Sequence, residues 1–234
     1  MSNLKKIIVA TLMLGLVVMA VFAYYIYNNI FVPNTLFENE KNARRFIKSI
    51  CPKKSQPDLN FSIINKYTDN SEIPDMLTPC KQGQNIGVIS DAGCPGIADP
   101  GAAVVEQAHI KGIKVVPLVG PSSILLAMMA SGFNGQNFSF NGYLPIDKRE
   151  RRIEIKRLER LSAEHHQSQL FIETPYRNNQ MLESLISTLH PQSHICVACD
   201  ITLPTEYIKT YTANDWKKIK VDLHKRPTLF IVQK

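Results

Sequence analysis

Residues 90–101 read Ser-Asp-Ala-Gly-Cys-Pro-Gly-Ile-Ala-Asp-Pro-Gly, and they form the most informative stretch of this sequence. Three glycines and two prolines give the stretch an irregular backbone whose main-chain groups a ligand can approach closely. The apolar residues 86–89 before it predict a buried strand. Asp99 and Pro100 are typical of a helix cap and a first helical residue, so we expect a helix from there to Gly112.

A second loop of the same kind follows. Residues 113–118 predict another buried strand, so that strand, helix and strand form a right-handed βαβ unit with parallel strands. Residues 120–123, Gly-Pro-Ser-Ser, then place hydroxyls at the cap of a helix over residues 124–131. Both loops would lie at the carboxyl ends of parallel strands, where open α/β sheets bind ligands; two tight connections without a ligand are the alternative. Neither loop has a GxGxxG or Walker spacing.

The second half of the chain predicts a sheet of its own. Buried strands are indicated at residues 170–172, 195–198 and 228–232. Two α/β lobes would therefore meet near Gly142, and ligand clefts are common at such junctions.

Residues 148–160 predict a basic helix that holds seven Lys or Arg against three Glu. Ile153, Ile155 and Leu158 are spaced as its inner side. A surface that contacts RNA phosphates is one interpretation, and ordinary solvated charge is the other. The net charge of +7 leaves the same two alternatives open for the whole chain.

The composition limits the class of protein. With 234 residues, 44% of them apolar and 20% charged, the chain is globular and is neither disordered nor collagen-like. Five cysteines without dense spacing favour reduced thiols in a cytosolic compartment over a secreted disulfide scaffold. Cys196 and Cys199 match half of a zinc site, but no second pair exists, so we expect small buried apolar side chains there and no metal.

The amino terminus argues for a different compartment. Residues 7–27 are twenty-one consecutive uncharged residues, long enough for a helix to cross a hydrocarbon core of ~30 Å. Lysines precede the run and tyrosines end it, which favours a membrane anchor. A cleaved signal peptide and a buried helix are the alternatives. Basic residues on both sides leave the orientation of an anchor undecided.

Four motifs occur in order along the rest of the chain. They are the stretch at residues 90–101, Pro-Leu-Val-Gly-Pro-Ser-Ser at 117–123, Gly-Tyr-Leu-Pro at 142–145 and Phe-Ile-Glu-Thr-Pro-Tyr-Arg at 171–177. Together they resemble the tetrapyrrole methylase superfamily, and within it the branch of the ribosomal small-subunit RNA methyltransferase I. The resemblance extends from about Phe37 to the end.

The resemblance implies a two-lobed, usually dimeric and cytoplasmic enzyme that binds S-adenosylmethionine between its lobes. In this branch it transfers the methyl group to the 2′-hydroxyl of a cytidine in ribosomal RNA, without a metal. Carried over by position, the cofactor contacts would be Asp91, Ala92, Gly93, Cys94, Pro121, Ser122, Ser123 and Thr174. Main-chain groups of glycine loops suit such a ligand.

The group that accepts the hydroxyl proton is unknown. Asp91 and Glu173 are candidates by position only, and each could instead cap a turn or pair with Arg177.

The resemblance fails at the amino terminus, where the family normally has an apolar strand and a proline–glycine turn. Residues 1–36 resemble instead the membrane anchor of an endolytic transglycosylase, on the strength of residues 24–27 and 31–35. The predicted fold class is α/β: a two-lobed tetrapyrrole-methylase-like fold with a mainly parallel first sheet and a mixed second lobe, preceded by an apolar helix. The predicted domains are an anchor or signal-like segment at 1–36, an amino-terminal lobe without the usual first strand at 37–142, and a carboxyl-terminal lobe at 143–234. Residues 7–17 could substitute for the missing strand, because residues 7–10 are apolar enough for a buried strand.

Three functions are compatible with these patterns. The first is an S-adenosylmethionine-dependent methyltransferase of ribosomal RNA that forms homodimers. The second is a methyltransferase of a tetrapyrrole or another small substrate. The third is an inactive remnant that residues 7–27 tether to a membrane.

Overall fold

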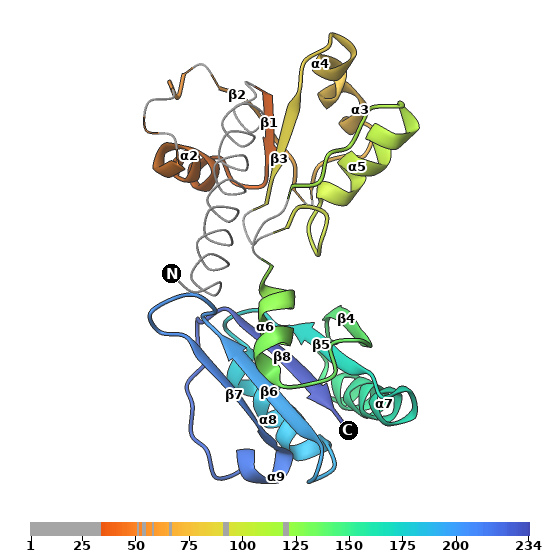
Figure 1. Cartoon of the computed structure of the whole chain (residues 1–234), viewed down its shortest axis with the longest axis vertical. Coiled ribbons are helices and arrows are strands. Elements are labelled where there is room, and N and C mark those ends of the chain that lie inside the picture. Colours follow the sequence, from red (N-terminus) through yellow and green to blue (C-terminus); the bar gives the residue numbers. More distant parts are fainter. Residues whose placement is uncertain are drawn as a thin grey trace, which may run out of the picture. The chain divides into compact units, whose positions relative to one another are not determined.

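The computed structural model describes residues 34–50, 52, 55–57, 59–65, 67–90, 94–118 and 122–234. The chain divides into two compact units, Met1–Gly120 and Pro121–Lys234 (Figure 1). The predicted apolar helix and membrane anchor at residues 7–27 lie outside the described residues. Among the helices that are described, none combines the length and the apolar character needed to cross a bilayer.

The first unit contains a parallel sheet, as predicted. Its strands are β1 (Asn34–Phe37), β2 (Asn60–Ile63) and β3 (Ile86–Ile89) in the order β2-β1-β3. In the register, Asn34 of β1 lies beside Asn60 on one side and Ile86 on the other. β1 is thus the central strand of the described sheet, and it begins before the predicted lobe boundary at Phe37.

Helices cover this sheet, with α2 at one side of the strands and α3 and α5 at the other (Figure 1). Their bounds are α2 Glu40–Ile50, α3 Ile73–Met76, α4 Thr78–Lys81 and α5 Gly101–Ile110. The buried residues of one apolar cluster come from the strands, α3, α5 and the segments beside them; they are Leu36, Ile64, Ile73, Leu77, Val104 and Ala108. The predicted helix after Asp99 is therefore confirmed, and it starts one residue after Pro100.

Residues 113–118 do not form the predicted strand. Ile113 and Val115 pack against the apolar cluster of the first unit, whereas Val116 and Leu118 are about half exposed. Partly buried and exposed side chains alternate at residues 113–116 as they would in a strand, but no backbone hydrogen-bond pairing joins this segment to a described strand. An apolar pattern sets which side chains face the core; the hydrogen bonds of a strand need a partner edge that the pattern does not provide.

The second unit contains the predicted mixed sheet. Its strands are β4 (Phe138–Tyr143), β5 (Ser168–Ile172), β6 (His194–Cys199), β7 (Tyr207–Thr212) and β8 (Thr228–Gln233), in the order β4-β5-β8-β6-β7. β4 and β5 are parallel, and the other neighbours are antiparallel. The helices are α6 (Ser123–Ser131), α7 (Lys148–His165), α8 (Asn178–Thr188) and α9 (Ala213–Trp216).

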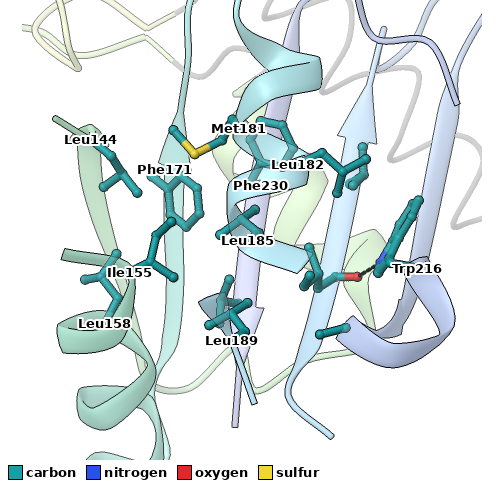
Figure 2. Packing of buried hydrophobic residues seen from close by; sticks show 14 of the residues in the cluster. Leu144, Ile155, Leu158, Phe171, Met181, Leu182, Leu185, Leu189, Trp216 and Phe230 are labelled. Carbon is teal, nitrogen blue, oxygen red and sulfur yellow. Dashed lines mark hydrogen bonds between the residues drawn. The ribbon is translucent and has the colours of Figure 1, made fainter. Parts of the chain in front are cut away.

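Both faces of this sheet are covered. α6 packs on one face, where Ala127 and Met128 belong to the same buried apolar cluster as Leu170 and Ile231. α7, α8 and α9 cover the other face, and Figure 2 shows Leu185 of α8 over Phe171 and Phe230 of the strands. The two phenylalanine rings stack with centroids 5.9 Å apart. Trp216 closes the end of this core and donates its indole N–H to the carbonyl of Ile195, 2.9 Å away.

Cys196 and Cys199 are buried, as predicted, and they lie in the two different apolar clusters on β6. Their thiols therefore face opposite sides of the sheet and cannot share a ligand. Burial raises the pKa of both thiols, which keeps them protonated and apolar. Within the described residues no cluster of His, Cys, Asp and Glu is arranged to hold a metal.

Replacing Leu185 by Ala should destabilise the chain by about 2–5 kcal/mol, because it opens a cavity between α8 and the sheet. Leu203, which is 51% exposed, supplies the matched control: Leu203→Ala should change the free energy of unfolding by less than about 0.5 kcal/mol. Urea unfolding followed by tryptophan fluorescence measures both. Equal losses in the two variants would contradict the packing described here.

Candidate functional site

The carboxyl ends of β1, β2 and β3 meet at one edge of the first unit's sheet because the strands are parallel. Glu38 directly follows β1 and Ser90 directly follows β3, and the Ser90 hydroxyl donates to Glu38 Oε1 at 3.4 Å. Sequence reasoning missed Glu38, since nothing marked residues 34–37 as a strand. The predicted ligand loop leaves the sheet at this polar pair.

Three of the predicted cofactor residues in this loop, Asp91, Ala92 and Gly93, lie outside the described residues. Cys94 is described and is partly buried. The loop beyond it is closed by Asp99, whose Oδ1 accepts from the backbone N–H of Gly96 at 2.6 Å and of Gly101 at 2.8 Å. A Cβ on Gly101 would lie 2.9 Å from both that oxygen and the Gly96 nitrogen, so this turn requires glycine there.

The second predicted loop ends at α6. Pro121 lies outside the described residues, Ser122 is the N-cap of α6, and Ser123 is its first residue. The Ser122 hydroxyl makes no capping hydrogen bond, contrary to expectation; its carbonyl accepts from Leu126 instead. The helix start is thus held by the main chain, and the hydroxyl is not used to cap it.

Thr174 lies in the turn after β5, next to a buried charge. The Glu173 side chain is 1% exposed, and its Oε1 accepts from the Thr174 N–H at 2.6 Å and from Arg177 Nη2 at 2.7 Å. The alternative in which Glu173 pairs with Arg177 is therefore confirmed. Glu173 Oε2 and Arg177 Nε are buried without a hydrogen-bond partner in the described structure. A buried carboxylate oxygen and a buried guanidinium N–H beside Thr174 thus lack hydrogen-bond partners among the described residues.

A loop distant in sequence supports this turn. Lys225 N–H donates to the carbonyl of Pro175 at 2.9 Å, and Asn178 Nδ2 donates to the carbonyl of Arg226 at 2.6 Å. Arg226 in turn bonds Asp200 at 2.8 Å. Burial alone would raise the pKa of Asp200, but hydrogen bonds from Arg226 and Thr205 outweigh it and hold that pKa below its usual range. Sequence patterns could not find these contacts.

The basic helix α7 differs from its sequence interpretation in two ways. Arg151 is buried and donates to the Ser184 hydroxyl at 3.2 Å and to the carbonyl of Ile146 at 3.1 Å. Ile153, predicted on the inner side, is 63% exposed. Ile155 and Leu158 are buried as predicted, and Arg151 occupies the inward position one turn before Ile155.

Much of the remaining charge on α7 is compensated. Lys156 pairs with Glu159, Arg157 with Glu154, and Arg160 with Glu164, in ion pairs three or four residues apart; these are 3.1, 2.6 and 3.8 Å long. Three cations are exposed and form no ion pair with a described residue: Lys148, Arg149 and Arg152. The unpaired positive charge of α7 is thus concentrated in its first turns.

Replacing Arg177 by Met should cost about 3 kcal/mol, because it leaves the Glu173 carboxylate buried without its counter-charge. The double variant Glu173→Gln/Arg177→Met should recover most of that loss, since no buried charge remains. Urea unfolding of the two single variants and the double variant measures the coupling. Additive losses would show that the two side chains do not interact.

Comparisons with known proteins agree with this architecture. The family model for Tetrapyrrole (Corrin/Porphyrin) Methylases matches residues 35–216. Two solved structures share the fold. The methyltransferase CobJ has a TM-score of 0.56 and 19% identity, and the match covers 87% of this chain and 83% of CobJ. The cobalamin biosynthetic enzyme cobalt precorrin-4 methyltransferase CbiF has a TM-score of 0.52 and 16% identity, and the match covers 86% of this chain and 84% of CbiF.

Curated relatives carry the name Ribosomal RNA small subunit methyltransferase I. The protein from Buchnera aphidicola subsp. Schizaphis graminum is 30% identical over 172 residues, 72% of this chain and 59% of the relative. The protein from Haemophilus influenzae is 32% identical over 160 residues, 68% of this chain and 54% of the relative. The chain therefore spans little more than half the length of these relatives. Because the family model matches most of the sequence, this chain belongs to the tetrapyrrole methylase family.

Proposed function

We propose that this chain is an S-adenosylmethionine-dependent methyltransferase of small-subunit ribosomal RNA, and that it modifies the ribose 2′-hydroxyl of a cytidine. The observation that carries the proposal is the 30% identity, across 72% of the chain, to a protein named Ribosomal RNA small subunit methyltransferase I. The carboxyl edge of the parallel sheet supports the proposal, because open α/β sheets bind ligands at such edges, and so does the polar turn after β5.

The residues at the turn after β5 fit the proposed cofactor. S-adenosylmethionine carries an ammonium and hydroxyl groups that donate hydrogen bonds, and a carboxylate that accepts them. Glu173 Oε2 is a buried acceptor without a partner, and Arg177 Nε is a buried donor without one. Because leaving such groups unpaired costs about 1–3 kcal/mol each, a ligand that satisfies them gains affinity.

The proposed cofactor-binding residues remain Asp91, Ala92, Gly93, Cys94, Pro121, Ser122, Ser123 and Thr174. When bound, S-adenosylmethionine would supply the methyl group: a hydroxyl oxygen attacks the methyl carbon, the bond to sulfur breaks, S-adenosylhomocysteine leaves, and the hydroxyl loses its proton to a general base or to water. Glu173 Oε1 accepts from Arg177 and from the Thr174 N–H, and we assign the remaining oxygen, Oε2, to holding the cofactor; the proton acceptor is not assigned to a residue. Asp99 and Gly101 keep the first loop in shape.

We also propose that the chain forms a homodimer. α6 contains no charged residue, and two of its apolar side chains are exposed one turn apart: Leu125 is 53% exposed and Met129 is 81% exposed. An apolar helix face of this kind is typical of a surface that a second protein copy covers.

Titration calorimetry of S-adenosylmethionine into the full-length chain, solubilised in mild detergent, should give saturable heat. Gly93→Trp should abolish that heat, because an indole would fill the space beside the loop main chain. Gly135→Trp is the matched control, since a Cβ at Gly135 meets no atom within 4 Å, and it should bind normally. If the folded, unaltered chain gives no heat, the inactive remnant is the correct interpretation.

If the chain does bind S-adenosylmethionine, label from a tritiated cofactor should appear in cytidine 2′-O-methyl groups of small-subunit ribosomal RNA.

Replacing Met129 by Glu should weaken the homodimer at least about a hundredfold, or ~3 kcal/mol, because the dimer would bury an unpaired charge. Ile153→Glu alters an apolar residue on α7 that is 63% exposed, and it should leave the association unchanged. Sedimentation equilibrium measures both variants. A monomeric unaltered chain, or equal weakening in the two variants, would rule out an interface on α6.

A further inference from the structure

α2 carries a line of exposed cations in the first unit. Lys41, Arg45 and Lys48 are all exposed, and they are spaced four and then three residues apart. Residues at this spacing share one face of a helix, and here that face is opposite the buried Ala43 and Ile47. At 1.5 Å of rise per residue the line extends over about 10 Å. We call these three residues the α2 stripe.

No ion pair with a described residue compensates the charge of the α2 stripe. Glu40 is the acidic residue of α2, and Arg44 holds it in an ion pair of 2.6 Å. Arg44 also lies over the Phe61 ring, 4.4 Å from its centroid, and donates to the carbonyl of Gln56 at 2.9 Å. Glu40 is thereby fixed beside Arg44, and within the described part of the chain no member of the α2 stripe forms an ion pair.

α7 provides the contrast. It has more basic residues than α2, yet three of them are paired with glutamates on the same helix and a fourth, Arg151, is buried. The first turns of α7 also contain Asp147 and Glu150 among their unpaired cations. The α2 stripe is therefore the longer uninterrupted line of positive charge, although α7 looks more basic in the sequence.

The α2 stripe begins at the proposed cofactor edge. β1 ends at Phe37, Glu38 bonds Ser90 at that edge, and α2 starts at Glu40. Lys41 is thus in the first turn of a helix that leads away from the carboxyl ends of the strands. A polyanion lying along the α2 stripe would have one end at this edge.

We propose that the α2 stripe binds the phosphate backbone of the substrate RNA and guides it to the carboxyl edge of the first sheet. This inference rests on the proposed function and adds a contact surface to it. Lys and Arg neutralise successive phosphates and release counterions, so their contribution is independent of base sequence and falls with salt. An anionic membrane is the competing partner for the same charges.

The test compares two triple variants that remove equal charge from the full-length chain. Lys41→Gln/Arg45→Gln/Lys48→Gln removes the α2 stripe, and Lys156→Gln/Arg157→Gln/Arg160→Gln removes paired cations from α7. The dissociation constant for in vitro transcribed small-subunit ribosomal RNA is measured at several salt concentrations. Loss of the α2 stripe should weaken binding and reduce the slope of log K against log salt by about 2, since each phosphate contact on a single strand contributes ~0.7. The α7 variant should keep the slope of the unaltered chain.

Two further measurements keep the inference separate from the proposed function. The α2 variant should give the same calorimetric heat with S-adenosylmethionine as the unaltered chain, which shows that its fold and cofactor site are intact. An unaltered chain without that heat would refute the proposed function, and the RNA slopes would still test the α2 stripe. An unchanged slope in the α2 variant, or equal reductions in both variants, would overturn the inference. The inference would also be overturned if the α2 variant still bound RNA but no longer bound phosphatidylglycerol vesicles.

Discussion

The second unit depends on burying both faces of one sheet. Phe230 and Ile231 are neighbours on β8, their side chains point to opposite faces, and both are completely buried. A strand in this position favours apolar residues on both faces rather than at every second residue, as in residues 229–232 of β8. α6 therefore has to cover one face while α7, α8 and α9 cover the other, and the arrangement of this unit follows from that requirement.

The buried polar groups of this sheet lie near the ends of its strands and have hydrogen-bond partners, as Gln169 does near the start of β5. Glu173 comes directly after β5 and is nearly as buried as the core, so its charge needs the guanidinium of Arg177. The pairing is incomplete, since Glu173 Oε2 and Arg177 Nε have no partner in the described structure. Stability alone would favour an apolar pair there, and unsatisfied groups that a fold retains are expected at functional sites. In the first unit, Glu38 and Ser90 form a comparable polar pair at a strand end.

The number of basic residues in a segment is a poor guide to its available charge. On α7, the buried Arg151 donates to the carbonyl of Ile146, and Arg157 forms an ion pair with Glu154 one turn away. On α2, Arg44 pairs with Glu40, and Lys41, Arg45 and Lys48 have no ion pair with a described residue. Local spacing determines which charges can meet on a helix. Which of them remain open to a partner depends also on contacts such as that of Arg44 with Phe61.

The sequence alone was sufficient to predict the family, the parallel and mixed sheets, the helix after Asp99 and the burial of Cys196 and Cys199. Each of these depends on local patterns: apolar runs, caps, glycine loops and ordered motifs. The order of the strands, the inward Arg151, the partner of Glu173 and the failure of residues 113–118 to form a strand were decided only by tertiary structure. The physical reason is that hydrogen bonds and ion pairs of these residues need partners supplied by the folded chain. A periodic pattern states which side chains are apolar, but it does not state which backbone edge or opposite charge will lie beside them.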